Sequence, residues 1–285
     1  MSEKIVVIGA GTMGAGIAQI AIEAGYVVNI VDTEMDFVNR GMGNINKFLK
    51  KKVEKGKLTQ AQYDDNISRL SGTNNTAEAV VDAVMVVEAV FEKFELKKEI
   101  FQKLDSLCPP NVILASNTST LSITSIAAVT NNPARVIGTH YFSPVPAMRL
   151  VEVIRGKETS DATANKTVDI CKNFGKVPIV VKDIPGFIVN RFLCLIYNEA
   201  ANMISNGDAG AKEIDEAMKL GCNWPMGITE IIDLAGVDVC GNAIAAMYQM
   251  TGEERYKPSP LFEKMIAGKK LGRKTGEGFY KYDTN

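Results

Sequence analysis

The sequence predicts an α/β protein: a doubly wound, mainly parallel sheet followed by an all-helical second domain. Three observations support this fold class. Short apolar runs alternate with amphipathic helical stretches over the first two thirds of the chain. A glycine-rich turn separates the first apolar run from the first helical stretch. After Asp183 only helical patterns follow until the last few residues, so we expect one domain over 1–184 and another over 185–285.

The first domain opens with two strands rich in β-branched residues, Lys4–Ile8 and Val27–Val31, which flank a helix over Ala15–Ala24. A charged helix over 36–57 and a second helix over 59–69 predict a helical-hairpin insertion. Further apolar runs predict more strands, and helices separate several of them. These strands are Met85–Ala89, Val112–Ala115, Val136–Thr139, Leu150–Ile154 and Pro178–Val181, and the helices are Phe94–Leu107 and Asp161–Phe174.

The second domain begins where Pro185 and Gly186 interrupt the pattern. Its apolar residues recur at helical spacing. The predicted helices are Phe187–Ser205, Ala211–Leu220, Gly227–Ala235, Val237–Met250 and Pro260–Ala267. The run Gly276–Tyr282 is expected to be an extended tail that packs back onto the domain.

The glycine-rich turn has the spacing of a dinucleotide-binding motif and consists of Gly9, Ala10, Gly11, Thr12, Met13 and Gly14. Gly9 permits the tight turn, Gly11 lets the backbone approach a pyrophosphate, and Gly14 allows the helix to pack closely on the strand. Asp32 ends the second strand, where it can bind a ribose 2′-OH and repel a 2′-phosphate. A purely structural glycine turn is the alternative. The strand, helix and acid together favour a Rossmann-type domain that binds NAD rather than NADP.

Composition narrows the function classes. The chain has 285 residues, 46% of them hydrophobic and 23% charged, with a net charge of -1, so it lacks the basic excess of nucleic-acid binders. The cysteines never form a C-x-x-C pair, which argues against a disulfide framework and a metal site and leads us to expect a cytoplasmic protein. The run Ile5–Ile22 is uncharged, but the nucleotide turn explains its glycines, so we expect no membrane span.

His140 is the only histidine, and it follows the apolar run Val136–Thr139. That position is the carboxyl end of a strand, where open α/β sheets bind ligands. An imidazole can accept and return a proton near neutral pH. Glu152 interrupts the next apolar strand, and since a buried carboxylate needs a partner, we expect it to bind one ring nitrogen of His140. The alternative is a structural core histidine, with Glu152 at a solvated strand end.

Several segments, in order along nearly the whole chain, closely resemble the 3-hydroxyacyl-CoA dehydrogenases. They are G-A-G-T-M-G at Gly9, A-S-N-T-S at Ala115, G-T-H-Y-F-S-P-V-P at Gly138, L-V-E-V-I at Leu150, K-D-I-P-G-F-I-V-N-R at Lys182 and K-T-G-E-G-F-Y at Lys274. The short length is similar to that of the bacterial 3-hydroxybutyryl-CoA dehydrogenases. Two positions depart from the family pattern: Ser143 stands where Asn is usual, and Ile228 where Pro is usual.

The resemblance implies that His140 is the general base and Glu152 its partner. It further implies that Ser119 contacts the substrate oxygen and that Asn190 positions the thioester end of the substrate. The residues alone favour structural roles instead, with Ser119 as a helix cap before Ile123 and Asn190 as a surface helix residue.

The resemblance also implies contacts to NAD and to coenzyme A. Besides the glycine turn, the expected NAD contacts are Asp32, Glu92, Lys97, Asn117, Ser119, Ser143 and Lys274. Lys50, Lys55 and Ser119 are the expected contacts to the CoA substrate. Without the resemblance, Glu92, Lys97 and the lysine-rich stretch 47–57 have the pattern of solvated helix faces.

The implied activity is reversible NAD-linked oxidation of a short-chain (S)-3-hydroxyacyl-CoA, such as 3-hydroxybutyryl-CoA, to a 3-oxoacyl-CoA. The alternatives are a 3-hydroxyacid dehydrogenase that acts on a free acid and a non-catalytic NAD-binding relative. A homodimer is expected, mainly from the resemblance.

Overall fold

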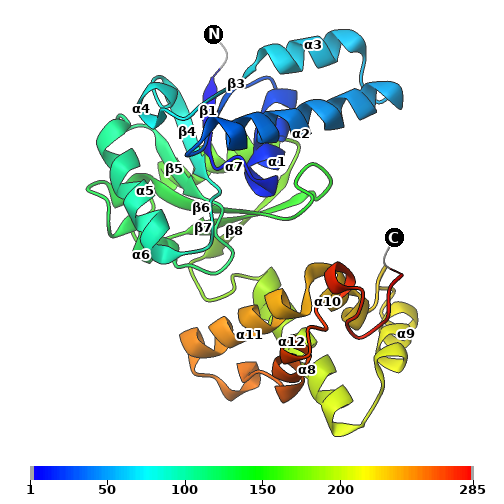
Figure 1. The fold of residues 1–285 in the computed structure, drawn as a ribbon. Helices are drawn as coiled ribbons and strands as arrows, with labels where there is room; N and C mark the ends of the chain where they lie inside the picture. Colours follow the sequence, from blue (N-terminus) through cyan, green and yellow to red (C-terminus); the bar gives the residue numbers. More distant parts are fainter. Residues whose placement is uncertain (1–2, 284–285) are drawn as a thin grey trace. The chain divides into compact units, whose positions relative to one another are not determined.

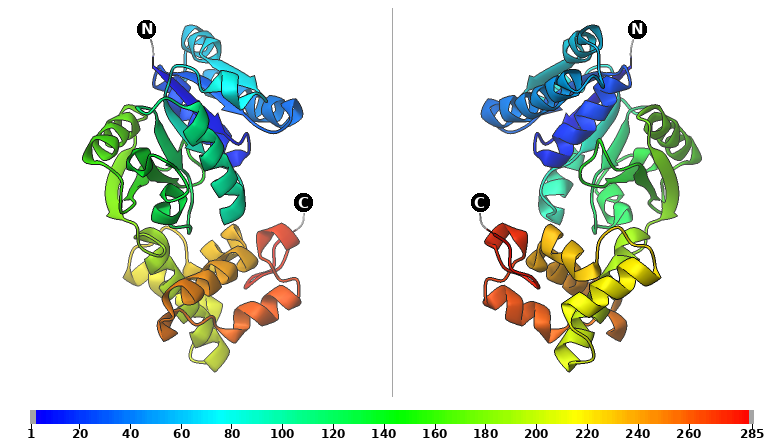
Figure 2. Two further views of the ribbon diagram at one scale, coloured as in Figure 1. Left: turned by 90° about the vertical axis from the view of Figure 1, so that its left-hand side faces the viewer. Right: turned by 90° about the vertical axis from the view of Figure 1, so that its right-hand side faces the viewer.

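The computed structural model describes residues 3–283, and the chain divides into two compact units, Met1–Ile184 and Pro185–Asn285. Figures 1 and 2 show the first unit in blue to green and the second in yellow-green to red. The first unit is a sheet with helices on both of its faces, and the second is helical (Figures 1 and 2). The predicted fold class, an α/β domain of the Rossmann type followed by an all-helical domain, is therefore confirmed.

The sheet has eight strands in the order β3-β2-β1-β4-β5-β6-β7-β8. Every neighbouring pair is parallel except β6 and β7, which run antiparallel. The order reverses between β1 and β4, which is the switch point where such sheets bind ligands at their carboxyl ends. The strands are β1 (Lys4–Ile8), β2 (Val27–Val31), β3 (Leu70–Thr73), β4 (Ala83–Glu88), β5 (Ile113–Ser116), β6 (Val136–Tyr141), β7 (Leu150–Arg155) and β8 (Val177–Lys182).

The helices of the first unit are α1 (Thr12–Glu23), α2 (Met35–Glu54), α3 (Gln60–Ser68), α4 (Thr76–Ala79), α5 (Phe94–Leu107), α6 (Ile123–Ala127) and α7 (Asp161–Asn173), with a 3-10 turn at Pro133–Arg135. Strand residues such as Ile5 and Val7 share one apolar cluster with α1 and α7, and both have no exposed surface. Helices α2 and α3 form the predicted hairpin (Figure 1), joined by a hydrogen bond from the Tyr63 hydroxyl to Asn46. The apolar packing of α1 and α7 against the strands fixes the carboxyl edge of the sheet.

Some elements differ from the sequence prediction. Strand β3 and the single-turn helix α4 were not predicted, because Leu70-Ser-Gly-Thr73 has no apolar alternation and α4 has only four residues. Helix α3 begins one residue later than predicted, since Thr59 is its N-cap in a capping box with Gln62. Strand β6 extends to Tyr141, one residue beyond His140, so His140 lies near the carboxyl end of the strand as predicted.

The second unit consists of α8 (Val189–Asn206), α9 (Ala211–Gly221), α10 (Ile228–Ala235), α11 (Val237–Thr251) and α12 (Pro260–Ala267), with 3-10 turns at Glu254–Tyr256 and Arg273–Thr275. Helix α8 begins two residues later than predicted, because Gly186 and Phe187 both have positive φ. Within residues 3–283 no single helix is long and apolar enough to cross a membrane. Only α10 and α11, counted as one segment, are long and apolar enough, and the two helices are bent by 100° relative to each other.

The segment after Thr275 packs back onto α10, as the sequence predicts for Gly276–Tyr282. Asp233, whose residue is 1% exposed, accepts hydrogen bonds from the backbone N–H groups of Phe279 and Tyr280 and from the Tyr282 hydroxyl. Asp215 accepts a further bond from the Tyr280 hydroxyl. The tail is therefore fastened by buried carboxylates rather than by apolar packing alone.

Candidate active site

The glycine turn lies between β1 and α1 and is shaped by close backbone contacts. Gly9 has φ of 104°, and its N–H donates to the Val31 carbonyl at 2.7 Å. A Cβ on Gly14 would lie 1.8 Å from the Gly9 carbonyl oxygen, so the turn excludes any side chain there. A Cβ on Gly11, by contrast, would meet no atom within 4 Å. Packing therefore requires Gly14 but gives no reason for Gly11, which fits a backbone kept bare for a ligand such as a pyrophosphate.

Asp32 follows β2 and braces this turn. Its Oδ2 accepts a hydrogen bond from the Ala10 N–H at 2.7 Å, and its Oδ1 accepts one from the Thr33 N–H at 2.7 Å. The side chain is half-buried; Oδ1 also accepts a longer hydrogen bond from the Thr33 hydroxyl at 3.3 Å, and Oδ2 has a second lone pair. The carboxylate thus faces the nucleotide turn at the switch point, and its contact to a ribose stays a prediction.

His140 and Glu152 are directly opposite each other on the antiparallel strands β6 and β7. His140 Nδ1 lies 2.7 Å from Glu152 Oε2, and the residues are 4% and 1% exposed. The alternative of a solvated Glu152 is therefore wrong. A carboxylate at Nδ1 favours the tautomer with its proton there, which leaves Nε2 as the basic nitrogen. Phe142 packs against the imidazole with ring centroids 4.4 Å apart, and this further fixes the ring.

The segment after β5 carries Asn117 and Ser119. The Asn117 side-chain oxygen accepts a hydrogen bond from the Tyr141 N–H at 3.0 Å, which ties this segment to the residue after His140. The Ser119 N–H donates to Glu92 Oε1 at 2.7 Å. Ser119 does not cap the following helix: Ser122 is the N-cap of α6 and accepts from the Ser125 N–H. The helix-cap alternative for Ser119 is therefore wrong.

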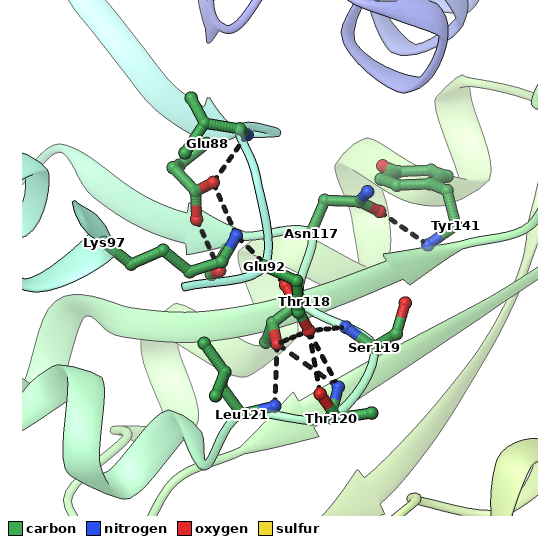
Figure 3. A network of polar contacts seen from close by, with 11 residues as sticks. Glu88, Glu92, Lys97, Asn117, Thr118, Ser119, Thr120, Leu121 and Tyr141 are labelled. Atoms are coloured by element: carbon green, nitrogen blue, oxygen red, sulfur yellow. Dashed lines mark hydrogen bonds and ion pairs between the residues drawn. The ribbon is translucent and has the colours of Figure 1, made fainter. Parts of the chain in front are cut away.

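Glu92 lies between β4 and α5 and Lys97 in the first turn of α5, and both belong to one polar network (Figure 3), in which the Glu92 side chain is 35% exposed. Lys97 has no exposed surface, so the solvated-face interpretation of this lysine is wrong. Its Nζ lies 2.6 Å from Glu88 Oε1 and 3.3 Å from Glu92 Oε2. An NAD contact by either residue stays a prediction.

The protonation state of Glu92 follows from its neighbours. Burial raises the pKa of Glu92, but the charge of Lys97 and hydrogen bonds from Thr118, Ser119 and Thr120 outweigh it and hold the pKa below its ordinary value. Glu92 is therefore an anion at neutral pH.

Ser143 is exposed in the segment that joins β6 to β7. Lys176 braces this segment through hydrogen bonds from its Nζ to the carbonyls of Val145 and Met148, the latter at 2.8 Å. These bonds hold the segment that follows His140 in the chain in a fixed position.

The remaining predicted residues come from other elements of the chain. Lys50 on α2 and Lys55 at its C-terminal end are exposed, and neither forms an ion pair within residues 3–283. Asn190 is the second residue of α8, and Lys274 Nζ lies 2.5 Å from Asp238 Oδ1; both belong to the second unit. Across the part of the chain that the structure describes, no group of three or more His, Cys, Asp or Glu side chains is arranged to hold a metal ion.

Sequence reasoning missed Glu88, Ser116 and Thr118 as members of the polar network. Glu88 ends β4 with no exposed surface and accepts a hydrogen bond from the Ser116 hydroxyl at 2.7 Å. The signal was present, because Glu88 interrupts the apolar run Ala83–Phe91 in the same way that Glu152 interrupts β7. No comparable signal marks Thr118.

Comparisons with known proteins show which family the chain is similar to. The model described as "3-hydroxyacyl-CoA dehydrogenase, NAD binding domain" matches residues 4–184, and that described as "3-hydroxyacyl-CoA dehydrogenase, C-terminal domain" matches residues 186–282. A 3-hydroxybutyryl-CoA dehydrogenase of Clostridioides difficile is 43% identical over 98% of this chain and 99% of its own length. The human mitochondrial hydroxyacyl-coenzyme A dehydrogenase is 41% identical over 98% of this chain and 91% of its own. The crystal structure of an (S)-3-hydroxybutyryl-CoA dehydrogenase from Ralstonia eutropha superposes with a TM-score of 0.97 at 41% identity, covering 100% of both chains.

Proposed function

The chain belongs to the 3-hydroxyacyl-CoA dehydrogenase family, as its sequence motifs predict, and we propose on this basis that it oxidises short-chain (S)-3-hydroxyacyl-CoA reversibly to 3-oxoacyl-CoA. The expected pair is 3-hydroxybutyryl-CoA and acetoacetyl-CoA. The observation that carries this proposal is the buried hydrogen bond between His140 and Glu152 at the carboxyl edge of the sheet that also bears the glycine turn.

The chain's own residues account for the proton transfer. His140 Nε2 takes the proton from the hydroxyl on C3 of the substrate, and the imidazolium that results is stabilised by the carboxylate of Glu152 at Nδ1. Ser119 donates a hydrogen bond to the substrate oxygen, and Asn190 positions the thioester end. When bound, NAD supplies the acceptor for the hydrogen that leaves C3 with its electron pair. In the reverse direction His140 returns the proton to the oxygen.

The glycine turn and Asp32 are the residues that would bind NAD. The bare backbone at Gly11 fits a pyrophosphate, and the carboxylate of Asp32 fits a ribose diol. The same carboxylate repels the 2′-phosphate of NADP, so we assign NAD as the preferred cofactor. By family resemblance, Ser143 is assigned to the nicotinamide side of NAD and Lys274 to a contact with NAD.

Coenzyme A would be bound at the hairpin. Lys50 on α2 and Lys55 at its C-cap are exposed cations, and the phosphates of coenzyme A need such partners. A homodimer in the cytoplasm is the remaining part of the proposal, supported by family membership and by cysteines that form no disulfide within the described residues.

The test is the loss of NADH absorbance with acetoacetyl-CoA, run beside free acetoacetate and beside NADPH. Rapid oxidation of NADH with the thioester alone supports the proposal. Activity on the free acid would favour a 3-hydroxyacid dehydrogenase, and NADH binding without any turnover would favour a non-catalytic relative. Activity that survives in the His140→Gln variant would contradict the proton-transfer step.

A further inference from the structure

A network of charged side chains connects the end of β4 to the segment that carries Ser119 (Figure 3). It begins at Glu88, which has no exposed surface. One carboxylate oxygen of Glu88 accepts a hydrogen bond from the Val90 N–H at 2.7 Å, and the other accepts one from the Ser116 hydroxyl at 2.7 Å. Because Glu88 and Ser116 are partners in the pairing of β4 with β5, this carboxylate is fixed to two strands of the sheet.

Lys97 extends the network away from the sheet. It comes from the first turns of α5, and its Nζ donates to Glu88 Oε1 at 2.6 Å and lies 3.3 Å from Glu92 Oε2. The side chains of Glu88 and Lys97 both have no exposed surface, so water does not weaken this ion pair. The ammonium therefore fixes the position of the Glu92 carboxylate relative to the sheet.

Glu92 in turn accepts several hydrogen bonds from the segment after β5. Its Oε1 accepts hydrogen bonds from the Thr118 hydroxyl at 2.5 Å, from the Ser119 N–H at 2.7 Å and from the Thr120 N–H at 3.0 Å. The Thr118 hydroxyl oxygen also accepts a bond from the Leu121 N–H at 2.8 Å. This segment has no helix or strand to fix it, so these bonds determine its conformation.

The bonds to Glu92 use the backbone of Ser119 and not its side chain. In Figure 3 the Ser119 side chain points away from Glu92, while its N–H points toward it. A shift of the Glu92 carboxylate would therefore move the whole residue and redirect its hydroxyl. A misplacement of about 1 Å at a contact to a reacting group can cost about a hundredfold in rate.

We propose that Glu88, Lys97 and Thr118 are positioning residues that act through the Glu92 carboxylate to place the Ser119 hydroxyl against the thioester substrate. This inference rests on the proposed function, because it assigns Ser119 to the substrate oxygen. A buried ion pair gives little net stability compared with apolar side chains of the same volume, so its value here lies in the geometry that it fixes.

The test is a double-mutant cycle between Thr118 and Ser119. Thr118→Val keeps the shape of the side chain but removes its hydroxyl. Thr118→Ser keeps the hydroxyl and removes only the methyl group. In the wild-type background we expect Thr118→Val to lower kcat/KM for acetoacetyl-CoA about tenfold and Thr118→Ser to recover most of it. In a Ser119→Ala background the same valine substitution should lower kcat/KM less than about twofold, because the group that it positions is gone.

A matched control separates positioning from general destabilisation. Thr167 is also buried with 0% exposure, and its hydroxyl donates to the Thr163 carbonyl within α7. Thr167→Val should have the same small effect on kcat/KM in both backgrounds. An equal, additive loss for Thr118→Val with and without Ser119, or no loss at all, would overturn the inference.

A second measurement does not depend on turnover. Hydrogen exchange of the peptide that covers residues 117–121 should be about tenfold or more faster in Thr118→Val and in Glu92→Gln than in wild type, with the peptides of α7 unchanged. Wild-type protein that fails to turn over acetoacetyl-CoA contradicts the proposed function, and unchanged exchange in 117–121 contradicts the network's control of the segment. The two failures are thus distinguished.

Discussion

Glu152→Gln is the substitution whose effect follows most directly from the geometry. The carboxylate oxygen lies 2.7 Å from His140 Nδ1, and Glu152 is 1% exposed. Two unit charges at this distance interact by about 6 kcal/mol at an effective dielectric constant of about 20. Glutamine still accepts a hydrogen bond, and the imidazolium is only partly formed in the transition state. We therefore expect a loss of about 4 kcal/mol, or about a thousandfold in kcat.

The assay is the initial rate of NADH oxidation at saturating acetoacetyl-CoA, with NADH affinity measured by fluorescence. The Kd for NADH should stay within about twofold, because Glu152 contacts the base and not the nucleotide turn. Glu158→Gln, an exposed position, is the matched control for loss of one carboxylate. Glu152→Asp keeps the charge and should retain more activity than the glutamine variant. A folded Glu152→Gln enzyme with kcat within about threefold of wild type would refute the role assigned to the pair.

Three other predictions concern the nucleotide turn and the polar network. Gly14→Ala should prevent stable folding, since its Cβ would lie 1.8 Å from the Gly9 carbonyl oxygen, whereas Gly11→Ala should fold with an unchanged Tm and lose about tenfold or more in NADH affinity, as measured by calorimetry. Asp32→Ser should narrow the preference for NADH over NADPH about tenfold in kcat/KM, and an unchanged ratio would refute the role of this carboxylate. Because the pKa of Glu92 is lowered on folding, its stabilising contribution is present above pH about 4.5 and is lost as the pH falls through the folded value. The free energy of unfolding in urea, measured between about pH 3 and about pH 6, should fall less steeply toward acid pH in Glu92→Gln than in wild type.

The fold was predictable where the local pattern is strong. Lys4–Ile8 and Val27–Val31 are short β-branched runs, and both are strands with the bounds expected from the sequence. Strand β3 was missed because Leu70-Ser-Gly-Thr73 forms a strand only through its pairing with β2. The antiparallel direction of β7 had a signal: only eight residues separate Tyr141 from Leu150, too few for a parallel crossover.

The candidate site was predictable as a set of residue types but only partly as a set of contacts. Glu152 was paired with His140 because a single carboxylate and a single histidine occurred in neighbouring apolar strands. The charge pattern of α5 alone predicts a solvated face for Lys97, and this alternative is wrong because its partner Glu88 comes from a different element. The sequence indicates that a buried charge needs a partner. The order of the strands in the folded sheet determines which residue that partner is.

Two strand-borne carboxylates, Glu88 and Glu152, therefore illustrate how one sheet supports different chemistry. Both are at most 1% exposed, and each faces a nitrogen at 2.6 or 2.7 Å. The partner of Glu88 is the Lys97 amine, which forms a fully buried ion pair with it, so that pair is a fixed structural anchor. The partner of Glu152 is an imidazole, which gains its charge only when it takes a proton, so the carboxylate there stabilises a charge that appears during the reaction. The difference between an anchor and a proton-transfer pair thus lies in the partner that each carboxylate meets, and not in the carboxylate or in its burial.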